Sequence, residues 1–340
     1  MPYKKDVTIK DVSERAGISI STVSRVLNTP DKVKQETREK VMAAIKELNF
    51  SSNSSLAQIR IQNFQNNFVY LFMPSIVNDS ISDIAHGASD YLADHNIQTL
   101  IWNSNESTER EQQGREFLNT HPAQGAVFIM SIVEDIPLEK TIAMPIATVE
   151  YIPEEKNADI LHVDNDQGMD LLIEHLVQLG HKNIAFLCGD ISSSNASRKI
   201  AAYKKALQAH HLPWKTDNIV PTDWNVEGGH RGIRKLLEWA PETTAVICIS
   251  DVLALGTIHG LRQMGLRCPE DISVTGFDNM PSSAFLTPRI TTLNYPAYQM
   301  GQDAAKCILK KIEDKKTPNI HKVYPLELIP GESTGKVRLK

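Results

Sequence analysis

Short apolar runs recur along the chain from residue 68 onwards, and helical patterns of about 10–18 residues separate most of them. Alternation of this kind predicts parallel sheets that are covered on both faces by helices. Roughly 270 residues are too many for one such sheet, so we expect two lobes. The apolar runs are FVYLFM, IQTLIW, GAVFIM, NIAFLC, TAVICI and ISVTGF, and the helical patterns include 165–180, 226–240 and 251–266.

The first 50 residues have a different pattern, which predicts three short helices. Thr8 is a candidate N-cap of the first helix, and Gly17 can take the left-handed conformation that ends it. Ser19 is a candidate N-cap of a second helix over 19–27, and apolar spacing predicts a third over 35–49. Two helices joined by a tight turn with glycine are typical of a helix-turn-helix unit, whose second helix enters the DNA major groove.

Charge is distributed unevenly along the chain. Residues 1–60 hold 11 Lys and Arg against 7 Asp and Glu, whereas the other 280 residues hold 25 against 34. A basic head on an acidic body suggests that only the head meets a polyanion. A chance fluctuation in composition remains the alternative.

The second predicted helix carries side chains that suit a DNA groove. Ser21, Thr22 and Ser24 are short and hydroxylated, so they let the backbone approach the bases and phosphates. Arg25 has the two-pronged guanidinium that matches the O6/N7 edge of guanine. This helix alone does not exclude a solvent-exposed helix with one stray arginine.

The segments VTIKDVSERAGISISTVSRVLN and TREKV resemble the heads of the LacI/GalR family of transcriptional regulators. The resemblance implies a repressor that binds a pseudo-palindromic operator in double-stranded DNA as a homodimer. The C-terminal GESTGKVRLK has no leucine heptad, which argues against a tetramer. By this resemblance the residues that read bases are Ile20, Ser21 and Arg25, and those that contact or face phosphates are Thr8, Thr22, Ser24 and Asn28.

Residues 51–67 are rich in Ser, Asn and Gln, which is typical of a linker. The segment also resembles the hinge helix of the family, which inserts an apolar side chain into a minor-groove step. The usual proline is replaced by Ser52, and counting from Phe50 puts Ile59 at the inserted position. An alternative register places Arg60 there, and a disordered linker without a DNA role is the other interpretation.

The rest of the chain resembles the same family through EHLVQLGHKNIAFLCG, SDVLALG and CPEDISVTGFDN. This resemblance implies two Rossmann-like lobes, similar to those of periplasmic sugar-binding proteins, with a small ligand between them. Ligands of such sheets lie at the carboxyl ends of the strands, where Asp278 follows ISVTGF. Asp251 is expected to hold local structure. The residues expected to contact the effector are Asp278, Trp224, Ser250, Glu150 and Tyr295, although Trp224 could equally have a packing role.

SRKIAAY departs from the family pattern, because Lys199 stands where members that bind free sugars usually have arginine. Arg198 lies beside it, and we count both as candidate effector contacts. An ammonium is a point charge and not a planar fork, so it favours a free sugar less. It could suit a phosphorylated sugar, a regulator controlled by a protein co-repressor, or a simple salt bridge.

Together these features predict an α plus α/β chain: a helix-turn-helix head at 1–50, a hinge linker or helix at 51–63, and a two-lobed body with parallel sheets at 64–340. The expected function is a repressor of carbohydrate-metabolism genes controlled by a sugar or sugar phosphate, with a catabolite-control regulator activated by a protein co-repressor as the alternative. The chain lacks the phosphate-loop, HExxH and GxSxG motifs, so we expect no enzyme, cofactor or metal.

A sugar-binding or transport protein without a DNA role is the other class of protein to consider. An exported sugar-binding protein would share the body, but the N-terminus MPYKKDVTIK has no apolar signal run and the chain has no apolar stretch long enough to span a membrane. Four scattered cysteines show no paired spacing, which is typical of a reducing compartment. We therefore expect a cytoplasmic protein without a membrane partner.

Overall fold

The computed structural model describes residues 9–28, 30–48, 50, 67–121, 123–133, 144–153, 157–191 and 193–338. The chain divides into two compact units, residues 1–68 and 69–340. Each unit has a hydrophobic core of its own, so we describe the two separately as the head and the body.

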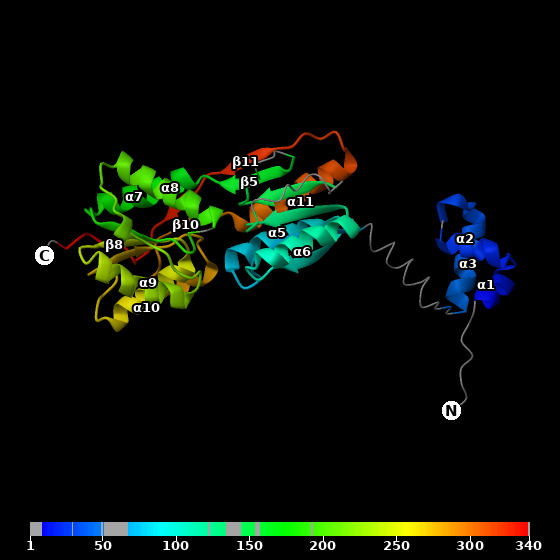
Figure 1. The fold of residues 1–340 in the computed structure, drawn as a ribbon, viewed down its shortest axis with the longest axis horizontal. Coiled ribbons are helices and arrows are strands. Elements are labelled where there is room, and N and C mark those ends of the chain that lie inside the picture. The colour runs from blue at the N-terminus through cyan, green and yellow to red at the C-terminus, as the bar shows by residue number, and fades with distance from the viewer. Residues whose placement is uncertain are drawn as a thin grey trace, which may run out of the picture. The chain divides into compact units, whose positions relative to one another are not determined.

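The head consists of three α-helices and a short 3-10 turn around a small core (Figure 1). Gly17 has a φ of +66°, the left-handed conformation expected where α1 ends. The amide of Thr22 donates to Oγ of Ser19 at 3.3 Å, so Ser19 caps α2 as predicted. Val12, Val23 and Val41 are wholly buried and join the helices to one another. The bounds are α1 Ile9–Ala16, α2 Ile20–Asn28, η1 Pro30–Lys32 and α3 Gln35–Glu47.

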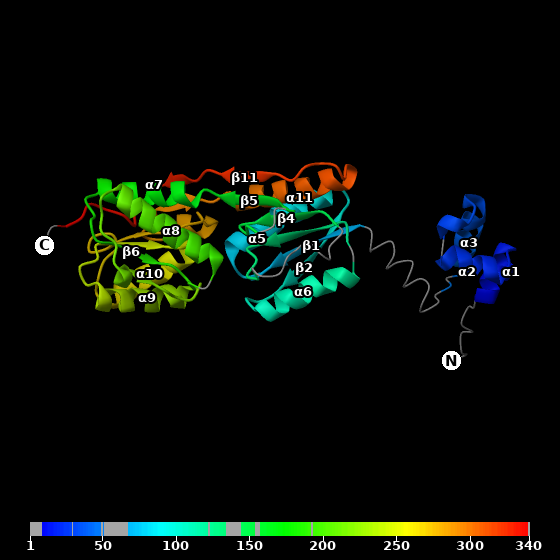
Figure 2. The same ribbon diagram turned by 45° about the horizontal axis from the view of Figure 1, so that its top comes forward.

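The first lobe of the body is built on a six-stranded sheet, in the described residues, with the order β11-β5-β4-β3-β1-β2. The registered pairs from β1 through β3, β4 and β5 to β11 are all parallel. Helices α5 and α11 pack against each other, and α6 covers the opposite face (Figure 2). The bounds are β1 Phe68–Met73, β2 Gln98–Asn103, β3 Gly125–Ile129, β4 Ile146–Val149, β5 Asp159–Val163, β11 His321–Tyr324, α5 Asp79–Asp94, α6 Thr108–Thr120 and α11 Ala297–Glu313.

The second lobe has a parallel sheet of order β7-β6-β8-β9, with α7 and α8 on one face and α9 and α10 on the other (Figure 2). A short antiparallel pair, β10-β12, lies beside it. The bounds are β6 Ile184–Leu187, β7 Ile219–Val220, β8 Ala245–Cys248, β9 Ser273–Thr275, β10 Thr292–Asn294, β12 Glu327–Ile329, α7 Asn165–Gln178, α8 Ser194–Ala209, α9 Val226–Trp239, α10 Asp251–Gln263, η2 Thr216–Asn218 and η3 Pro281–Phe285.

The backbone passes between the lobes from β5 to α7, from β10 to α11 and from β11 to β12. The first and last of these crossovers lie side by side, because β5 and β11 are paired and both continue into the second lobe (Figure 1). The amide of Asp164 donates to the Tyr324 carbonyl at 2.8 Å, and the side chain of Gln167 both donates to and accepts from Leu326. The two crossovers therefore form one strap.

Side-chain caps explain where several helices begin, because they satisfy amides that the first turn leaves unpaired. Asn78 caps α5, Asp164 caps α7 and Asn225 caps α9. Among the described residues, no helix is long and apolar enough to span a membrane.

Candidate functional site

The recognition surface predicted in the head lies on α2. Ile20 is 47% exposed, and Ser21 and Arg25 are also exposed, whereas Val23 and Val26 of the same helix are buried in the head. The period of the helix thus presents the predicted base-reading side chains on one face.

Hydroxyl groups cluster at the start of this helix. Oγ of Ser19 lies 3.0 Å from Oγ of Ser21 and 2.9 Å from Oγ1 of Thr22, and Ser24 is partly buried one turn further along. Each hydroxyl can donate and accept, so the cluster can reorganise toward phosphate oxygens. Thr8, Ile59 and the side chain of Asn28 lie outside the described residues.

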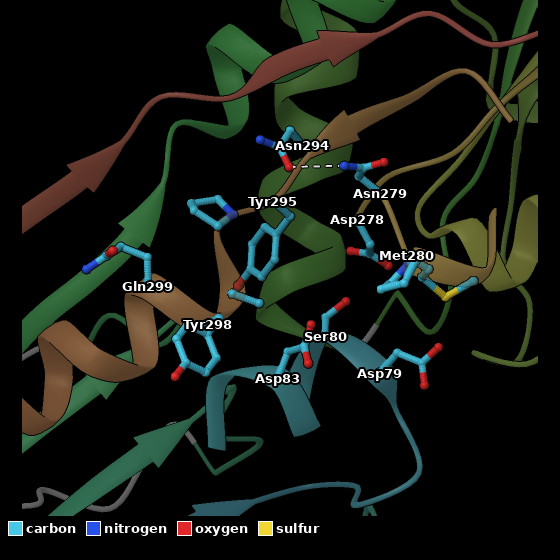
Figure 3. A pocket seen from close by; sticks show the side chains of 13 residues that line it. Asp79, Ser80, Asp83, Asp278, Asn279, Met280, Asn294, Tyr295, Tyr298 and Gln299 are labelled. Atoms are coloured by element: carbon cyan, nitrogen blue, oxygen red, sulfur yellow. Dashed lines mark hydrogen bonds between the residues drawn. The ribbon is translucent and has the colours of Figure 1, made fainter. Parts of the chain in front are cut away.

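A pocket of about 350 Å³ lies in the body, between the start of α5 in the first lobe and the segment after β9 in the second. Figure 3 shows Asp278 facing Ser80 and Asp83 of α5, with the ring of Tyr295 beside them. Of the predicted effector contacts, the structure brings Asp278 and Tyr295 into this pocket. The lining consists of Asp79, Ser80, Asp83, Asp278, Asn279, Met280, Pro281, Asn294, Tyr295, Pro296, Ala297, Tyr298 and Gln299.

Asp278 is the carboxylate at the centre of the site. It follows β9, has a φ of +126°, and faces Ser80 of the other lobe across the pocket (Figure 3). Burial raises the pKa of Asp278 well above its usual range, and the charge of Asp251 raises it further, whereas Lys199 and Ser80 oppose the shift. A half-buried carboxyl at this position suits a ligand with hydroxyl groups.

Tyr295 brings an unsatisfied hydroxyl to the same pocket. The side chain is 6% exposed, and its hydroxyl has no hydrogen-bond partner among the described residues. Burial raises the pKa of Tyr295 well above its usual range, with Glu150 and Asp278 adding to the shift, so the hydroxyl keeps its proton. A buried polar group without a partner is costly, and a bound ligand is one explanation for it.

Lys199 lies behind the pocket and is not part of its lining. The ammonium is buried, donates to Oδ1 of Asn195 at 3.1 Å and lies 4.2 Å from the centre of the Phe277 ring. Burial lowers the pKa of Lys199, and the charges of Glu150 and Asp278 oppose that shift. Lys199 therefore contacts Asn195 and Phe277 behind the pocket, with Glu150 and Asp278 near enough to influence its pKa.

Arg198 and Glu150 join the two lobes. Arg198 of α8 donates to the Glu150 carbonyl oxygen at 2.7 Å, and its guanidinium lies 3.5 Å from a carboxylate oxygen of the same residue. Glu150 follows β4, is 1% exposed and accepts from the Val163 amide at 2.7 Å. Both residues lie outside the pocket lining.

Ser250 and Trp224 are also placed outside the lining. The Ser250 hydroxyl accepts from the Leu253 amide at 3.3 Å and caps α10, so it is used by the fold. Trp224 packs against Gly189, where an added Cβ would lie 2.6 Å from the indole. Asp251 holds local structure, as expected, since it accepts from Thr292 at 2.6 Å and from the Met280 amide at 2.9 Å.

Sequence patterns did not predict the contribution of α5 and of the crossover before α11 to the pocket. Ser80 and Asp83 come from the first turns of α5, and Asn294 and Gln299 come from either side of Tyr295. One usable signal was Asn78, which marks a helix start directly after β1. Among the described lining residues, the ionisable side chains other than tyrosine are Asp79, Asp83 and Asp278, and none is Lys, Arg or His.

Comparisons with known proteins agree with this architecture. Residues 8–53 match the model of bacterial regulatory proteins of the lacI family, and residues 173–334 match a periplasmic binding protein-like domain. The transcriptional regulator RegA of Clostridium saccharobutylicum is 30% identical over 330 residues, which cover 96% of this chain and 99% of RegA.

Two solved structures of similar proteins match nearly the whole length of the chain. The lac repressor dimer bound to operator and the anti-inducer ONPF has a TM-score of 0.76 at 26% identity, covering 97% of this chain and 100% of that one. The complex of the regulator CelR with cellobiose has a TM-score of 0.72 at 25% identity, covering 96% and 99%. The chain therefore belongs to the LacI family of DNA-binding bacterial transcriptional regulators.

Proposed function

We propose that this regulator represses genes of carbohydrate metabolism and that an uncharged sugar, bound in the pocket around Asp278, controls its affinity for the operator. The chemistry of the pocket lining carries this proposal. Carboxylates, amides and hydroxyls suit the hydroxyl groups of a sugar. The absence of Lys, Arg and His among the described lining residues disfavours a sugar phosphate, whose dianion would face Asp79, Asp83 and Asp278.

In the DNA complex, Arg25 reads a guanine, and Ile20 and Ser21 contact neighbouring bases in the major groove. Thr22, Ser24, Thr8 and Asn28 contact phosphates, and Ile59 is inserted into a minor-groove step. Exposure of Ile20, Ser21 and Arg25 on one face of α2 supports this arrangement. One head reads only a half-site, so a homodimer binds a pseudo-palindromic operator. The protein acts in the cytoplasm, where such an operator is found.

In the body, Asp278 accepts hydroxyl hydrogens of the sugar and Tyr295 supplies a hydroxyl to it. Glu150, Arg198 and Lys199 hold the walls of the site from behind, Trp224 packs beside Gly189, and Ser250 fixes the start of α10. Ser80 and Asp278 line the pocket from opposite lobes, and the hydrogen bond from Arg198 to Glu150 joins the lobes. The site is assigned to binding and not to catalysis.

Control of DNA binding requires two states of the body. A sugar shifts their balance only by binding one state better than the other, and a swing from 1:99 to 99:1 requires about 10⁴-fold preference. Contacts between the lobes form or break with closure, which makes the pocket the place where that preference arises.

The test measures operator affinity of the full-length protein with and without sugars. Selected DNA is first bound at 50 mM and 200 mM salt, and affinity is expected to fall steeply between them because phosphate contacts release counterions. Ribose, cellobiose and ribose 5-phosphate are then compared in thermal shift. A shift with a free sugar and none with the phosphate supports the proposal. A shift only with the phosphate contradicts the proposal that the effector is uncharged. No shift with a broad panel of sugars would favour a protein co-repressor.

A further inference from the structure

A pair of histidines lies in the first lobe, away from the pocket. His162 is on β5 and His321 is on the adjacent edge strand β11, where Val323 is paired with His162 and His321 is paired with Ile160. Residues two apart on a strand share a face, so the two imidazoles are diagonal neighbours on one side of the sheet. Their Nε2 atoms lie 2.7 Å apart, and the pair is exposed to solvent.

The hydrogen bonds of the pair specify its protonation. Nδ1 of His162 lies 2.9 Å from the Val163 carbonyl oxygen, which can only accept, so this nitrogen carries a proton. In the neutral pair, Nε2 of His162 is therefore the acceptor and Nε2 of His321 is the donor. Donation from Nδ1 to a backbone carbonyl is also the arrangement that orients a histidine whose Nε2 binds a metal.

We propose that His162 and His321 form a binding site for a divalent transition-metal ion of the kind that prefers imidazole, such as Zn²⁺, Ni²⁺ or Cu²⁺. The ion takes the place of the shared hydrogen and accepts the Nε2 lone pairs of both rings. The proton on Nε2 of His321 moves to its other ring nitrogen, so the neutral pair binds the ion without a net change in protons. The described part of the chain has no group of three or more His, Cys, Asp or Glu side chains that could hold a metal ion, and the proposal assigns these two imidazoles as the ligands from the protein.

The geometry requires only a small adjustment. Zinc–nitrogen bonds of about 2.0–2.1 Å at a tetrahedral angle place the two nitrogens roughly 3.3 Å apart. The present separation is 2.7 Å, so the two nitrogens must part by about 0.6 Å. His321 is exposed on β11 at the edge of the described sheet, so this adjustment lies at the surface and not in the core.

The position of the pair gives the bound ion a structural effect. β5 and β11 lead directly into the two crossovers that form the strap between the lobes (Figure 1). An ion held by both histidines cross-links the edge strand to its neighbour, and any ligand that binds only the folded protein raises its stability. We therefore expect metal to stabilise the first lobe at the base of the strap.

The experiment uses untagged full-length protein that has been stripped of metal with EDTA and dialysed. Titration with ZnCl₂ or NiCl₂ is followed by calorimetry and thermal unfolding, and the spectrum of bound Cu²⁺ reports the number of coordinating nitrogens. Wild-type protein is expected to bind one ion per chain with a rise in melting temperature, and Cu²⁺ to show two imidazole nitrogens. MgCl₂ is expected to give no shift, because Mg²⁺ prefers oxygen ligands.

The variants His162→Gln and His321→Gln are each expected to weaken this binding at least about tenfold. His259→Gln is the matched control, because His230 and His259 lie near each other but Gln263 bridges them. Thermal unfolding of the metal-free variants shows whether each of them folds. If His162→Gln does not fold, the variant at the exposed His321 decides the result. Failure of the wild type to bind, unchanged binding in His321→Gln, or equal loss in the control overturns the proposal. Operator binding is independent of this result.

Discussion

Arg198 of the second lobe donates a 2.7 Å hydrogen bond to the backbone carbonyl oxygen of Glu150 in the first. The acceptor is fixed by its own surroundings, since the Glu150 carboxylate accepts from the Val163 amide where β5 enters the strap. Arg198 thus connects α8 of the second lobe to the end of β5, where the first lobe continues into the strap. A body that opens must break this contact, so it is a direct probe of lobe closure.

Replacing Arg198 by alanine is expected to reduce the free energy of unfolding by about 1.5–3 kcal/mol, the range for hydrogen bonds to charged groups. Hydrogen exchange at the Val163 amide should become faster, because its acceptor loses a neighbour. Lys205→Ala is the control on the same helix, since the ion pair of Lys205 with Asp166 is exposed and such pairs contribute about 0–1 kcal/mol. Equal effects in the two variants would contradict a role of Arg198 in holding the two lobes together.

Asp278→Asn is expected to change how stability depends on pH. Burial and the charge of Asp251 raise the pKa of Asp278 in the folded protein, so folding favours its protonated form. The stabilisation from this protonated carboxyl is fully present below about pH 3.9, the pKa of an aspartate in the unfolded chain. It is lost as pH rises through the pKa of Asp278 in the folded protein. The variant should therefore lose less stability than wild type in urea titrations as pH rises from about 4. Asp83→Asn, which removes an exposed carboxylate of the same pocket, is the comparison variant.

Tyr295→Phe should have opposite effects with and without ligand. Removing a buried hydroxyl that has no partner among the described residues is expected to leave the empty protein as stable or slightly more stable. A sugar that uses the hydroxyl should bind about 5- to 150-fold more weakly, corresponding to about 1–3 kcal/mol for an unpaired polar group. Tyr324→Phe is the control, since that hydroxyl donates to Asp303 at 2.7 Å and the residue lies outside the pocket lining. Thermal shift with the active sugar measures both.

The sequence predicted the parts of the fold that depend on local patterns. α1 ends at Gly17, and Ser19 caps α2. Both features follow from the chemistry of single residues. Asp278 was found because a buried strand ends just before it. Short strands such as β4 and β5 were not singled out, since Thr148, Asp159 and His162 interrupt their apolar pattern.

The other wall of the pocket could not be predicted in the same way. Ser80 and Asp278 line the same pocket only because two segments distant in the sequence meet there, and no local sequence pattern predicts such a meeting. Ser250 was expected at the effector, but its hydroxyl caps α10, a role for which serine is equally suited. The assignment of the individual effector and DNA contacts stays a prediction.

Arg25→Ala is expected to weaken operator binding by about 1–3 kcal/mol, roughly 5- to 150-fold, and to relax the preference at one base pair. The loss should be smaller on operators already changed at that base pair, because the guanidinium no longer has its guanine. Arg15→Ala removes the same charge from the head, but Arg15 is paired with Glu47 at 2.6 Å, so its effect should not depend on operator sequence. A uniform loss for Arg25→Ala across operators would assign it to phosphate contact. Fluorescence titration at fixed salt distinguishes the outcomes.

Two glycines hold α5 against α11, and thereby set one wall of the pocket. A Cβ at Gly301 would lie 1.9 Å from the Ile84 carbonyl oxygen, and a Cβ at Gly87 would lie 2.0 Å from that of Tyr298. Both obstacles are backbone, so Gly301→Ala must push the helices apart, at a cost of about 1–3 kcal/mol or more. Gly335→Ala is the control, since its Cβ would lie 3.3 Å from a proline side chain. Because α5 also carries Ser80 and Asp83, Gly301→Ala should weaken sugar binding as well as lower the melting temperature. A variant that melts early but binds sugar normally would show that the helix contact does not position the pocket.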